Sequence, residues 1–368
     1  MARSTRSRPT HDIVVVGASA GGVEALVTLV RGLPADLPAA LFVVLHIPPY
    51  GASQLPAILT HHGPLPAAHA THGEAIAPGR IYVAPPDHHL LVRDGHVELT
   101  HGPRENGSRP AVDPLFRSAA RAHGARVVGI VLSGALGDGS VGMMTIAARG
   151  GVTVVQDPEE ALFESMPRAA LRCVRVDHIL PVHQIPALLG RLARAPAAYR
   201  EAIGFPTRST MDEIMPHLVR RDITAQERNE RSGETTVFTC PECGGTLWQA
   251  EHQGLMQFNC HVGHTFAAES LLGQMSEELE AALWRCARML TEKATLARQL
   301  AGRLRAAGRE AQAARVEEQA HLDDGQGRLI RTMLLEATPH PETRPLVVEQ
   351  ALEEVSREGQ PPASADGG

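Results

Sequence analysis

The chain has 368 residues, 43% of them hydrophobic, and 35 Lys and Arg against 41 Asp and Glu leave a net charge of −6. A single hydrophobic core rarely organises that many residues, so we expect one domain of ordinary size and a second, smaller unit. The negative charge excludes the broad basic field that binds nucleic acid. No apolar run approaches the roughly 20 residues of a membrane helix, so membrane insertion is not expected.

From His11 to about Pro196, short β-branched runs alternate with Ala- and Leu-rich stretches, which is typical of βαβ units. We therefore predict an α/β fold with a doubly wound parallel sheet. The predicted strands are 13–16, 41–45, 81–84, 127–132 and 152–156. The predicted helices are 23–32, 53–61, 114–123, 140–149, 167–172 and 185–194. The segment HVELTHGP resembles the second strand of a hairpin, which predicts an antiparallel edge on the sheet.

The chain divides by composition into one large domain and several shorter segments. We place the α/β domain at 11–196, after a disordered start at 1–10. Mixed charge without an apolar period then predicts a linker at 197–236, before a compact Cys/His module at 237–270. Residues 271–337 are rich in Ala, Glu, Arg and Leu and predict a helical hairpin or coiled coil, and the tail 338–368 is predicted to be disordered.

An apolar stripe supports the helical prediction for 271–337. Residues at three- and four-residue steps form this stripe, with breaks allowed at Gly308, Gly325 and Gly327. The stripe comprises Leu279, Leu283, Cys286 or Ala287, Leu290, Ala297, Leu300 and Leu304. Cys286 and Cys173 both fall on apolar periodic positions, which favours core roles for these two thiols.

The first predicted strand runs into Gly17-Ala18-Ser19-Ala20-Gly21-Gly22 and then into a helix. Small residues around Ser19 permit a sharp turn that places its hydroxyl at a helix N-terminus, where backbone N–H groups favour an anion. As a dinucleotide-binding loop the segment fails the G-x-G-x-x-G spacing, because Ser19 replaces the second glycine. As a nucleophile elbow it requires a base and an orienting carboxylate nearby.

Two candidates follow other predicted strands. His46 comes directly after 41–45, and Asp138 lies in the loop SGALGDG after 127–132. The carboxyl ends of parallel strands share one rim, so Ser19, His46 and Asp138 are expected to converge there as a catalytic triad. Taken singly, each has a plainer interpretation, since a chain with 19 His has many structural histidines and a Gly-rich loop often contains a turn-forming Asp. The joint placement favours catalysis.

Motifs between about Asp12 and Leu189 resemble the catalytic domain of the CheB-type chemotaxis protein-glutamate methylesterases. The motifs are VGASAGGVEAL, VVLHIPP, IYVAPPDHHLLV, RPAVDPLFRSAA, GIVLSGALGDGSVGM, GGVTVVQDPEEALFESMPRAAL and VDHILPV. The resemblance implies hydrolysis of methylated glutamates on chemoreceptors with release of methanol, often with deamidation of receptor glutamines, and no cofactor for catalysis. It assigns Ser19 as nucleophile, His46 as base and Asp138 as the orienting carboxylate.

The same resemblance implies further site residues and partners. The backbone around Ala135, where the family commonly has methionine, would help form the oxyanion hole, while Ala20, Met166 and Pro167 would line the site. Ala20 stands where many members have threonine, so the help of that hydroxyl is lost. Methylated chemoreceptors or related signalling proteins are the implied partners, with a cognate protein-glutamate methyltransferase as a further candidate. The rival interpretation is a non-catalytic binding or scaffold module of a chemosensory pathway.

Classical members of the family carry an N-terminal phosphorylatable receiver domain. Only about ten residues precede the first predicted strand here, so we expect no control by phosphorylation within this chain.

Three of the five cysteines fall in a metal-ligand pattern instead of a disulfide framework. Cys240 and Cys243 form one C-x₂-C pair, and Cys260 with either His261 or His264 can complete a tetrahedral Cys₃His set for structural Zn²⁺. His264 better matches the pattern CPxCGG…CxxGH, which resembles the tails of some larger methylesterase-like proteins. The expected role of this zinc ribbon is partner choice, separate from the chemistry. Free thiols and the lack of a secretion signal before the first apolar run predict a cytoplasmic setting.

Overall fold

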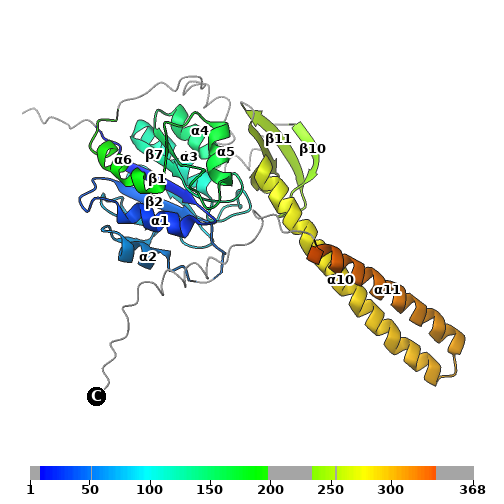
Figure 1. The fold of residues 1–368 in the computed structure, drawn as a ribbon. Coiled ribbons are helices and arrows are strands. Elements are labelled where there is room, and N and C mark those ends of the chain that lie inside the picture. Colours follow the sequence, from blue (N-terminus) through cyan, green and yellow to red (C-terminus); the bar gives the residue numbers. More distant parts are fainter. Residues whose placement is uncertain (1–8, 51, 198–233, 253–254, 337–368) are drawn as a thin grey trace, which may run out of the picture. The chain divides into compact units, whose positions relative to one another are not determined.

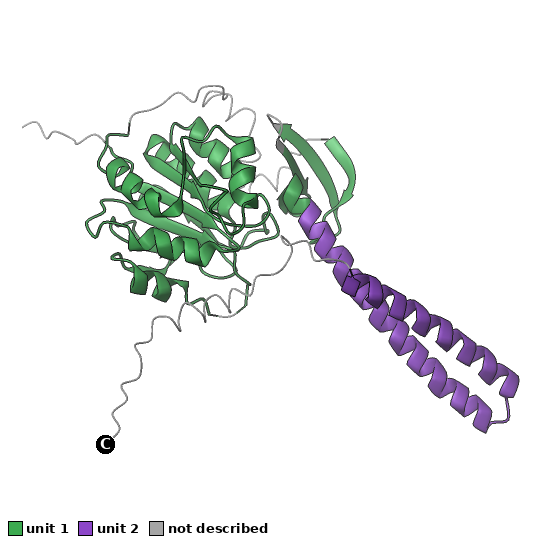
Figure 2. Cartoon of the chain, in the orientation of Figure 1, with its two compact units in different colours: residues 1–271, 345–368 green, residues 272–344 purple. Residues whose placement is uncertain are grey.

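The computed structural model describes residues 9–50, 52–197, 234–252 and 255–336 (Figure 1). The predicted disordered ends and most of the predicted linker fall outside these residues. The chain comprises two compact units: residues 1–271 with 345–368, and residues 272–344 (Figure 2).

A seven-stranded sheet in which all neighbours are parallel forms the centre of the larger unit, and it confirms the predicted doubly wound α/β fold (Figure 1). Its order is β3-β4-β2-β1-β7-β8-β9. The strands are β1 (Ile13–Ala18), β2 (Ala40–Leu45), β3 (Ala67–His69), β4 (Ile81–Val83), β7 (Val127–Val131), β8 (Val152–Gln156) and β9 (His178–Leu180). The chain leaves β1 toward β2 on one side and later fills the other side through β7. Open α/β sheets bind ligands at the carboxyl ends of strands beside such a reversal.

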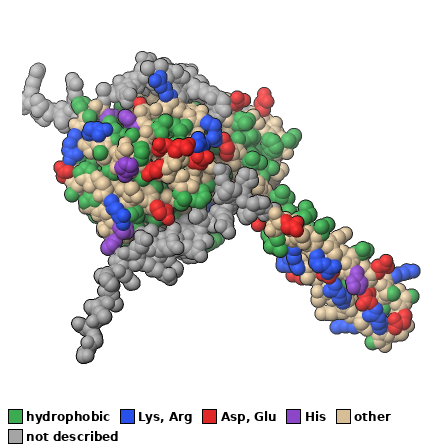
Figure 3. Space-filling model, in the orientation of Figure 1, with side chains coloured by type: hydrophobic (Ala, Val, Ile, Leu, Met, Phe, Trp, Pro, Cys, Tyr) green, Lys and Arg blue, Asp and Glu red, His purple; other side chains and the backbone are tan. Residues whose placement is uncertain are grey.

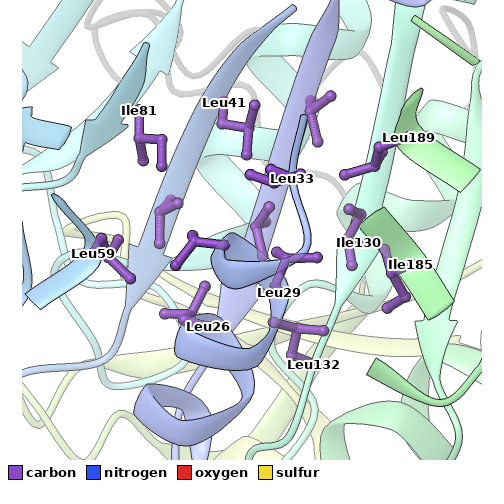
Figure 4. Packing of buried hydrophobic residues seen from close by; sticks show 14 of the residues in the cluster. Leu26, Leu29, Leu33, Leu41, Leu59, Ile81, Ile130, Leu132, Ile185 and Leu189 are labelled. Atoms are coloured by element: carbon purple, nitrogen blue, oxygen red, sulfur yellow. The ribbon is translucent and has the colours of Figure 1, made fainter. Parts of the chain in front are cut away.

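Helices cover both faces of this sheet, as the two separate groups of core residues demonstrate. One group joins the sheet to α1 (Gly22–Arg31), α2 (Leu55–His62) and α6 (Ile185–Leu192), as Figure 4 illustrates with Leu26, Leu29 and Ile185 over the strands. The other group joins it to α3 (Val112–His123), α4 (Ser140–Ala148) and α5 (Ser165–Cys173). Two 3₁₀ turns, Gly124–Arg126 and Val182–Gln184, complete the connections. Burial on both faces explains why the central strands are uniformly apolar in sequence.

The predicted antiparallel edge is wrong. The hairpin of β5 (His89–Val92) and β6 (Val97–Thr100) forms a separate two-stranded sheet, while the edges of the main sheet are β3 and β9. Leu90, Val92 and Val97 of this hairpin are buried in the core on the α3 side. Because β3 and β9 are three residues long and none of their residues is fully buried, they lack the apolar run by which the other strands were predicted.

A second, four-stranded antiparallel sheet lies in the same unit, where the zinc ribbon was predicted. Its strands, in spatial order, are β10 (Glu234–Thr239), β11 (Thr246–His252), β12 (Leu255–Cys260) and β13 (Thr265–Ala267). Its small core contains Leu247, Phe258, Phe266 and Leu271 together with two cysteine side chains. So few apolar residues bury too little surface to stabilise a sheet of this size alone.

Two long helices, α10 (Ala268–Ala306) and α11 (Glu310–Glu336), end the described chain, with a turn at Gly308. Their seam is made of small residues at seven-residue intervals, which allow the helices to approach closely. These are Ala287, Ala294 and Ala301 on α10, with Ala313, Ala320 and Gly327 on α11, all buried. No described helix is apolar enough over sufficient length to cross a bilayer.

The observed contact line between the two helices differs in part from the apolar stripe that the sequence predicted. Leu279, Cys286 and Leu300 are exposed, so the core role predicted for Cys286 is wrong, whereas Cys173 is half-buried and packs against the core of the α/β domain. The smaller alanines occupy the contact line instead. The face of the hairpin drawn in Figure 3 carries charged side chains of both signs. Between the two helices, Lys293 forms an ion pair with the buried Asp323.

Candidate active site and metal centre

Ser19 lies in a tight turn between β1 and α1. The turn requires small residues: Gly21 has a left-handed backbone (φ 67°), and a Cβ on it would lie 2.8 Å from the Ser133 hydroxyl. Ser133 braces the turn, because its hydroxyl donates to the Ala20 carbonyl at 2.7 Å and its carbonyl accepts from the Ser19 N–H at 3.0 Å. The Ser19 side chain is thereby held, half-buried, at the carboxyl end of β1.

His46 follows β2 and lies beside this turn, since its backbone N–H donates to the Ala18 carbonyl at 3.2 Å. Its Nε2 lies 2.8 Å from Asp138 Oδ2. A carboxylate can only accept, so Nε2 carries the proton and Nδ1 is left with the lone pair that a base needs. Among the described residues, no hydrogen bond joins the Ser19 hydroxyl to this imidazole. The structure thus pairs His46 with Asp138 directly and places Ser19 on the adjacent strand end.

Asp138 is almost fully enclosed, with 1% of its surface exposed. Besides His46, its donors are the backbone N–H groups of Val112 (2.6 Å), Asp113 (3.1 Å) and Gly139 (2.8 Å) and the side-chain amide of Asn106 (2.9 Å). Burial acts to raise the pKa of Asp138, but the hydrogen bonds from His46 and the backbone outweigh it and hold the pKa below its usual value. Asp138 therefore remains a carboxylate that can stabilise an imidazolium.

A second buried carboxyl group, Asp113, shares the Asn106 amide with Asp138. Asp113 Oδ1 accepts from the Gly142 N–H at 2.7 Å, and Asp113 Oδ2 lies 3.2 Å from Asn106 Nδ2. Burial, with the charge of Asp138 nearby, raises the pKa of Asp113 to about 8. Burial and the nearby charge thus favour the neutral form of Asp113, while Asp138 is held in the charged form.

This raised pKa predicts a specific pH dependence of stability. An acid whose pKa is higher in the folded protein stabilises it fully below the unfolded pKa, near 3.8, and that stabilisation is lost as the pH rises to about 8. Asp113→Asn removes the titration. We expect the difference in unfolding free energy between variant and parent to shift in favour of the variant from pH 4 to 8, measured by chemical denaturation. A difference that stays constant over this range would contradict the assignment.

Gly17 lies near the carboxyl end of the central strand β1 and permits the close approach of α3 to this strand. A Cβ on Gly17 would overlap Val112, whose N–H holds Asp138. We expect Gly17→Ala to destabilise the fold by about 1–3 kcal/mol through overpacking, measured by denaturant unfolding. Gly302→Ala is the matched control, because a Cβ on Gly302 meets nothing within 4 Å and alanine favours a helix. Equal unfolding midpoints for the two variants would refute this packing role.

The predicted oxyanion residues lie around the same turn. The Met166 N–H donates to the Gly134 carbonyl at 2.9 Å, and a Cβ on Gly134 would overlap the Met166 sulfur and lie 3.0 Å from Ser19 Cβ. Gly134 therefore lies between Met166 and Ser19, and the role of Met166 as a lining residue remains a prediction. Among the described residues, the backbone N–H groups of Ala20 and Ala135 donate no hydrogen bond, which suits donors for an oxyanion. Pro167, buried in α5, remains a prediction as a lining residue.

Sequence reasoning missed three residues of this site: Ser133, Asn106 and Asp113. Asn106-Gly107 is a turn-forming dipeptide, and both residues have positive φ (52° and 74°), so a turn was detectable but not its contact with Asp138. Asp113 looks in sequence like an ordinary acidic residue of a first helical turn. Only the packing of α3 against the β7–α4 loop makes it part of the site.

Four potential ligands converge in the ribbon. Cys240, Cys243, Cys260 and His264 have ligand atoms within 4.8 Å of one another, whereas His261 is exposed and is not part of the cluster. The His264 Nδ1 atom lies 3.6 Å from Cys240 Sγ and 3.4 Å from Cys260 Sγ. The two sulfurs of Cys243 and Cys260 are 3.6 Å apart.

These distances fit a tetrahedral zinc ion. Bonds of about 2.3 Å to sulfur and about 2.0 Å to nitrogen give edges of about 3.8 Å between sulfurs and about 3.5 Å between sulfur and nitrogen. The two turns that carry the ligands also suit a metal site. Gly244 and Gly263 have positive φ, and the His264 N–H donates to the Cys260 sulfur at 3.2 Å. The donor set is thus compatible with a structural Cys₃His zinc site.

The chain is similar in sequence to proteins of a known family. The CheB methylesterase family matches residues 14–189. The "Protein-glutamate methylesterase/protein-glutamine glutaminase 2" of Anaeromyxobacter dehalogenans is 40% identical over 183 residues, which cover 50% of this chain and 54% of that protein. A Leptospira interrogans protein provisionally given the same enzyme name is 36% identical over 183 residues, 50% of this chain and 95% of that protein.

The crystal structure of the Thermotoga maritima CheB methylesterase catalytic domain aligns with a TM-score of 0.47 at 32% identity, over 49% of this chain and 98% of that one. The chain spans about half the length of the Anaeromyxobacter relative. It spans nearly the whole of the Leptospira relative, and the match to the family, residues 14–189, includes the Ser19 turn, His46 and Asp138. The chain belongs to the CheB methylesterase family.

Proposed function

We propose that this protein is a protein-glutamate methylesterase that hydrolyses glutamate methyl esters on methylated chemoreceptors or related signalling proteins. The observation that carries the proposal is the His46–Asp138 pair at 2.8 Å beside the Ser19 turn, in a chain of this family. The names of the relatives support the reaction class.

In the first half of the reaction, the Ser19 oxygen attacks the ester carbonyl while His46 Nδ1 takes the hydroxyl proton. Asp138 stabilises the resulting imidazolium through Nε2–H. The negative charge on the former carbonyl oxygen is placed against the backbone N–H groups of Ala20 and Ala135. The tetrahedral intermediate expels methoxide, which takes the proton from His46 and leaves as methanol, with a glutamyl ester on Ser19.

In the second half, His46 removes a proton from water, the hydroxide attacks the Ser19 ester, and the serine leaves with that proton. The products are the free glutamate side chain and the regenerated enzyme. A glutamine side chain would follow the same course with ammonia as the leaving group, so deamidation of receptor glutamines is part of the proposal. No step requires a cofactor.

We assign the Cys₃His cluster a structural Zn²⁺. Four protein ligands leave no open position for a substrate or a reactive water. The proposal also includes a reducing, cytoplasmic setting, because none of the five cysteines, all of which are described, forms a disulfide. A cognate protein-glutamate methyltransferase remains the further candidate partner.

The test is methanol release from receptor fragments that carry methylated glutamates, combined with labelling by a fluorophosphonate. We expect stoichiometric methanol and a covalent adduct that peptide mapping locates on Ser19. Parallel assays of unmethylated fragments with glutamine at the same positions report ammonia. Tight binding of methylated fragments without methanol release or Ser19 labelling would instead establish a non-catalytic binding module.

A further inference from the structure

Asn106 connects the ribbon to the triad. Its backbone N–H donates to the Thr265 carbonyl at 2.7 Å, and its Oδ1 accepts from the Ala267 N–H at 2.9 Å. Both partners belong to β13, and the Asn106 side chain is buried, with 5% of the residue exposed. The ribbon strand therefore holds Asn106 by its main chain and by its side chain.

The other end of the same amide faces the triad. Asn106 Nδ2 donates to Asp138 Oδ1 at 2.9 Å and to Asp113 Oδ2 at 3.2 Å. The two ends of the amide have opposite requirements, because Ala267 supplies a donor while Asp138 supplies an acceptor. An asparagine satisfies both in one orientation, and its left-handed backbone (φ 52°) is a conformation that asparagine tolerates well.

We propose that Asn106 is a positioning residue for Asp138 and that β13 holds it in place, so that the metal-loaded ribbon accelerates the reaction at Ser19. The inference rests on the proposed esterase function. It differs from the expectation drawn from the sequence, in which the ribbon contributes to partner choice and not to the chemistry.

The route from the metal cluster is short. β13 begins at Thr265, directly after the ligand His264, and Thr265 is itself buried. Without a cation to join Cys260 and His264, the small ribbon core leaves β13 weakly held. Ala267 then no longer fixes Oδ1, the Asn106 amide can rotate, and Asp138 loses one of the donors that orient it toward His46.

A matched pair of proline substitutions in the full chain tests this link. Ala267→Pro deletes the N–H that binds Asn106, at the end of the edge strand β13, where proline is tolerated. Ala268→Pro makes the same change one residue later, at the first position of α10, which favours proline and whose N–H has no helical partner. Zinc content, expected at about one per chain for a closed four-ligand site, verifies that each ribbon is intact.

We expect Ala267→Pro to lower kcat on a small methyl ester about tenfold with little change in KM, and Ala268→Pro to retain the parent rate. A second readout is independent of turnover: the downfield NMR signal of the His46 Nε2 proton, assigned by its loss in His46→Ala. This signal should move or broaden in Ala267→Pro and stay in place in Ala268→Pro. Zinc-loaded Ala267→Pro with the parent kcat and an unmoved proton signal would overturn the proposal.

Asn106→Gly gives an independent variant that keeps the positive φ and deletes the amide. We expect the same loss of kcat, the same change in the His46 signal, and no further loss of rate when a chelator removes the metal, because the link is already cut. By reciprocity, this variant should also release zinc to a chelator more readily than the parent. Additive losses from the substitution and from chelation would refute the link.

If the parent released no methanol but the His46 signal responded as stated, the esterase function would fail and the positioning role would stand.

Discussion

Replacement of Ser19 or His46 by alanine is expected to abolish nearly all ester hydrolysis while the protein remains folded. In a serine protease, loss of the serine or the histidine costs about six powers of ten in kcat. The same two roles are assigned here to Ser19 on the β1–α1 turn and to His46, whose Nε2 is bound to Asp138. Methanol release from a small methyl ester measures the effect, with circular dichroism and denaturant unfolding as folding controls.

Asp138→Asn is expected to cost less, about four powers of ten, because an amide favours the wrong imidazole tautomer but leaves the serine and histidine in place. Thr28→Ala is a suitable control, since this partly exposed hydroxyl on α1 donates to the Glu24 carbonyl of its own helix. A Ser19→Ala protein that released methanol at the parent rate would remove the serine from the mechanism and with it the triad.

Zinc removal is expected to unfold the ribbon, the second large effect. Its buried core has only Leu247, Phe258, Phe266 and Leu271 besides the cysteines. Folded ribbons of this size depend on the metal. The apparent free energy of Zn²⁺ binding to zinc-finger peptides is about 10–16 kcal/mol at neutral pH. The double variant Cys240→Ser, Cys243→Ser should therefore lose both the zinc and the β10–β13 sheet. Elemental analysis measures the loss of zinc, and the susceptibility of the ribbon to proteolysis measures the loss of the sheet.

The seven-stranded sheet has its own core on both faces and should survive chelation, so the esterase loses rate through Asn106 but not its fold. Cys286→Ser is the matched control, because this exposed thiol lies on α10 outside the cluster. A ribbon that resisted proteolysis equally well with and without metal would refute the dependence on zinc.

Periodicity in the sequence predicted the architecture of the first half correctly because both faces of the sheet are covered. β1, β2, β7 and β8 are buried along their whole length, so each is an uninterrupted apolar run that local analysis detects. The short, partly exposed β3 and β9 carry no such signal. In the helical hairpin, the helices were predicted but the contact line was not, because alanines at seven-residue intervals support a closer seam than the larger leucines beside them.

By itself, the sequence determined the α/β fold, the strand ends that bear Ser19, His46 and Asp138, and a Cys₃His pattern, since each depends on local spacing along the chain. The tertiary structure decided which groups surround Asp138, because Asn106, Asp113 and Val112 reach it only when α3 packs against β1 and the β7–α4 loop. It also decided that β13, some 160 residues from Asn106, holds the amide that binds the aspartate. Hydrogen bonds over such separations leave no periodic trace in a sequence, so only the folded chain reveals them.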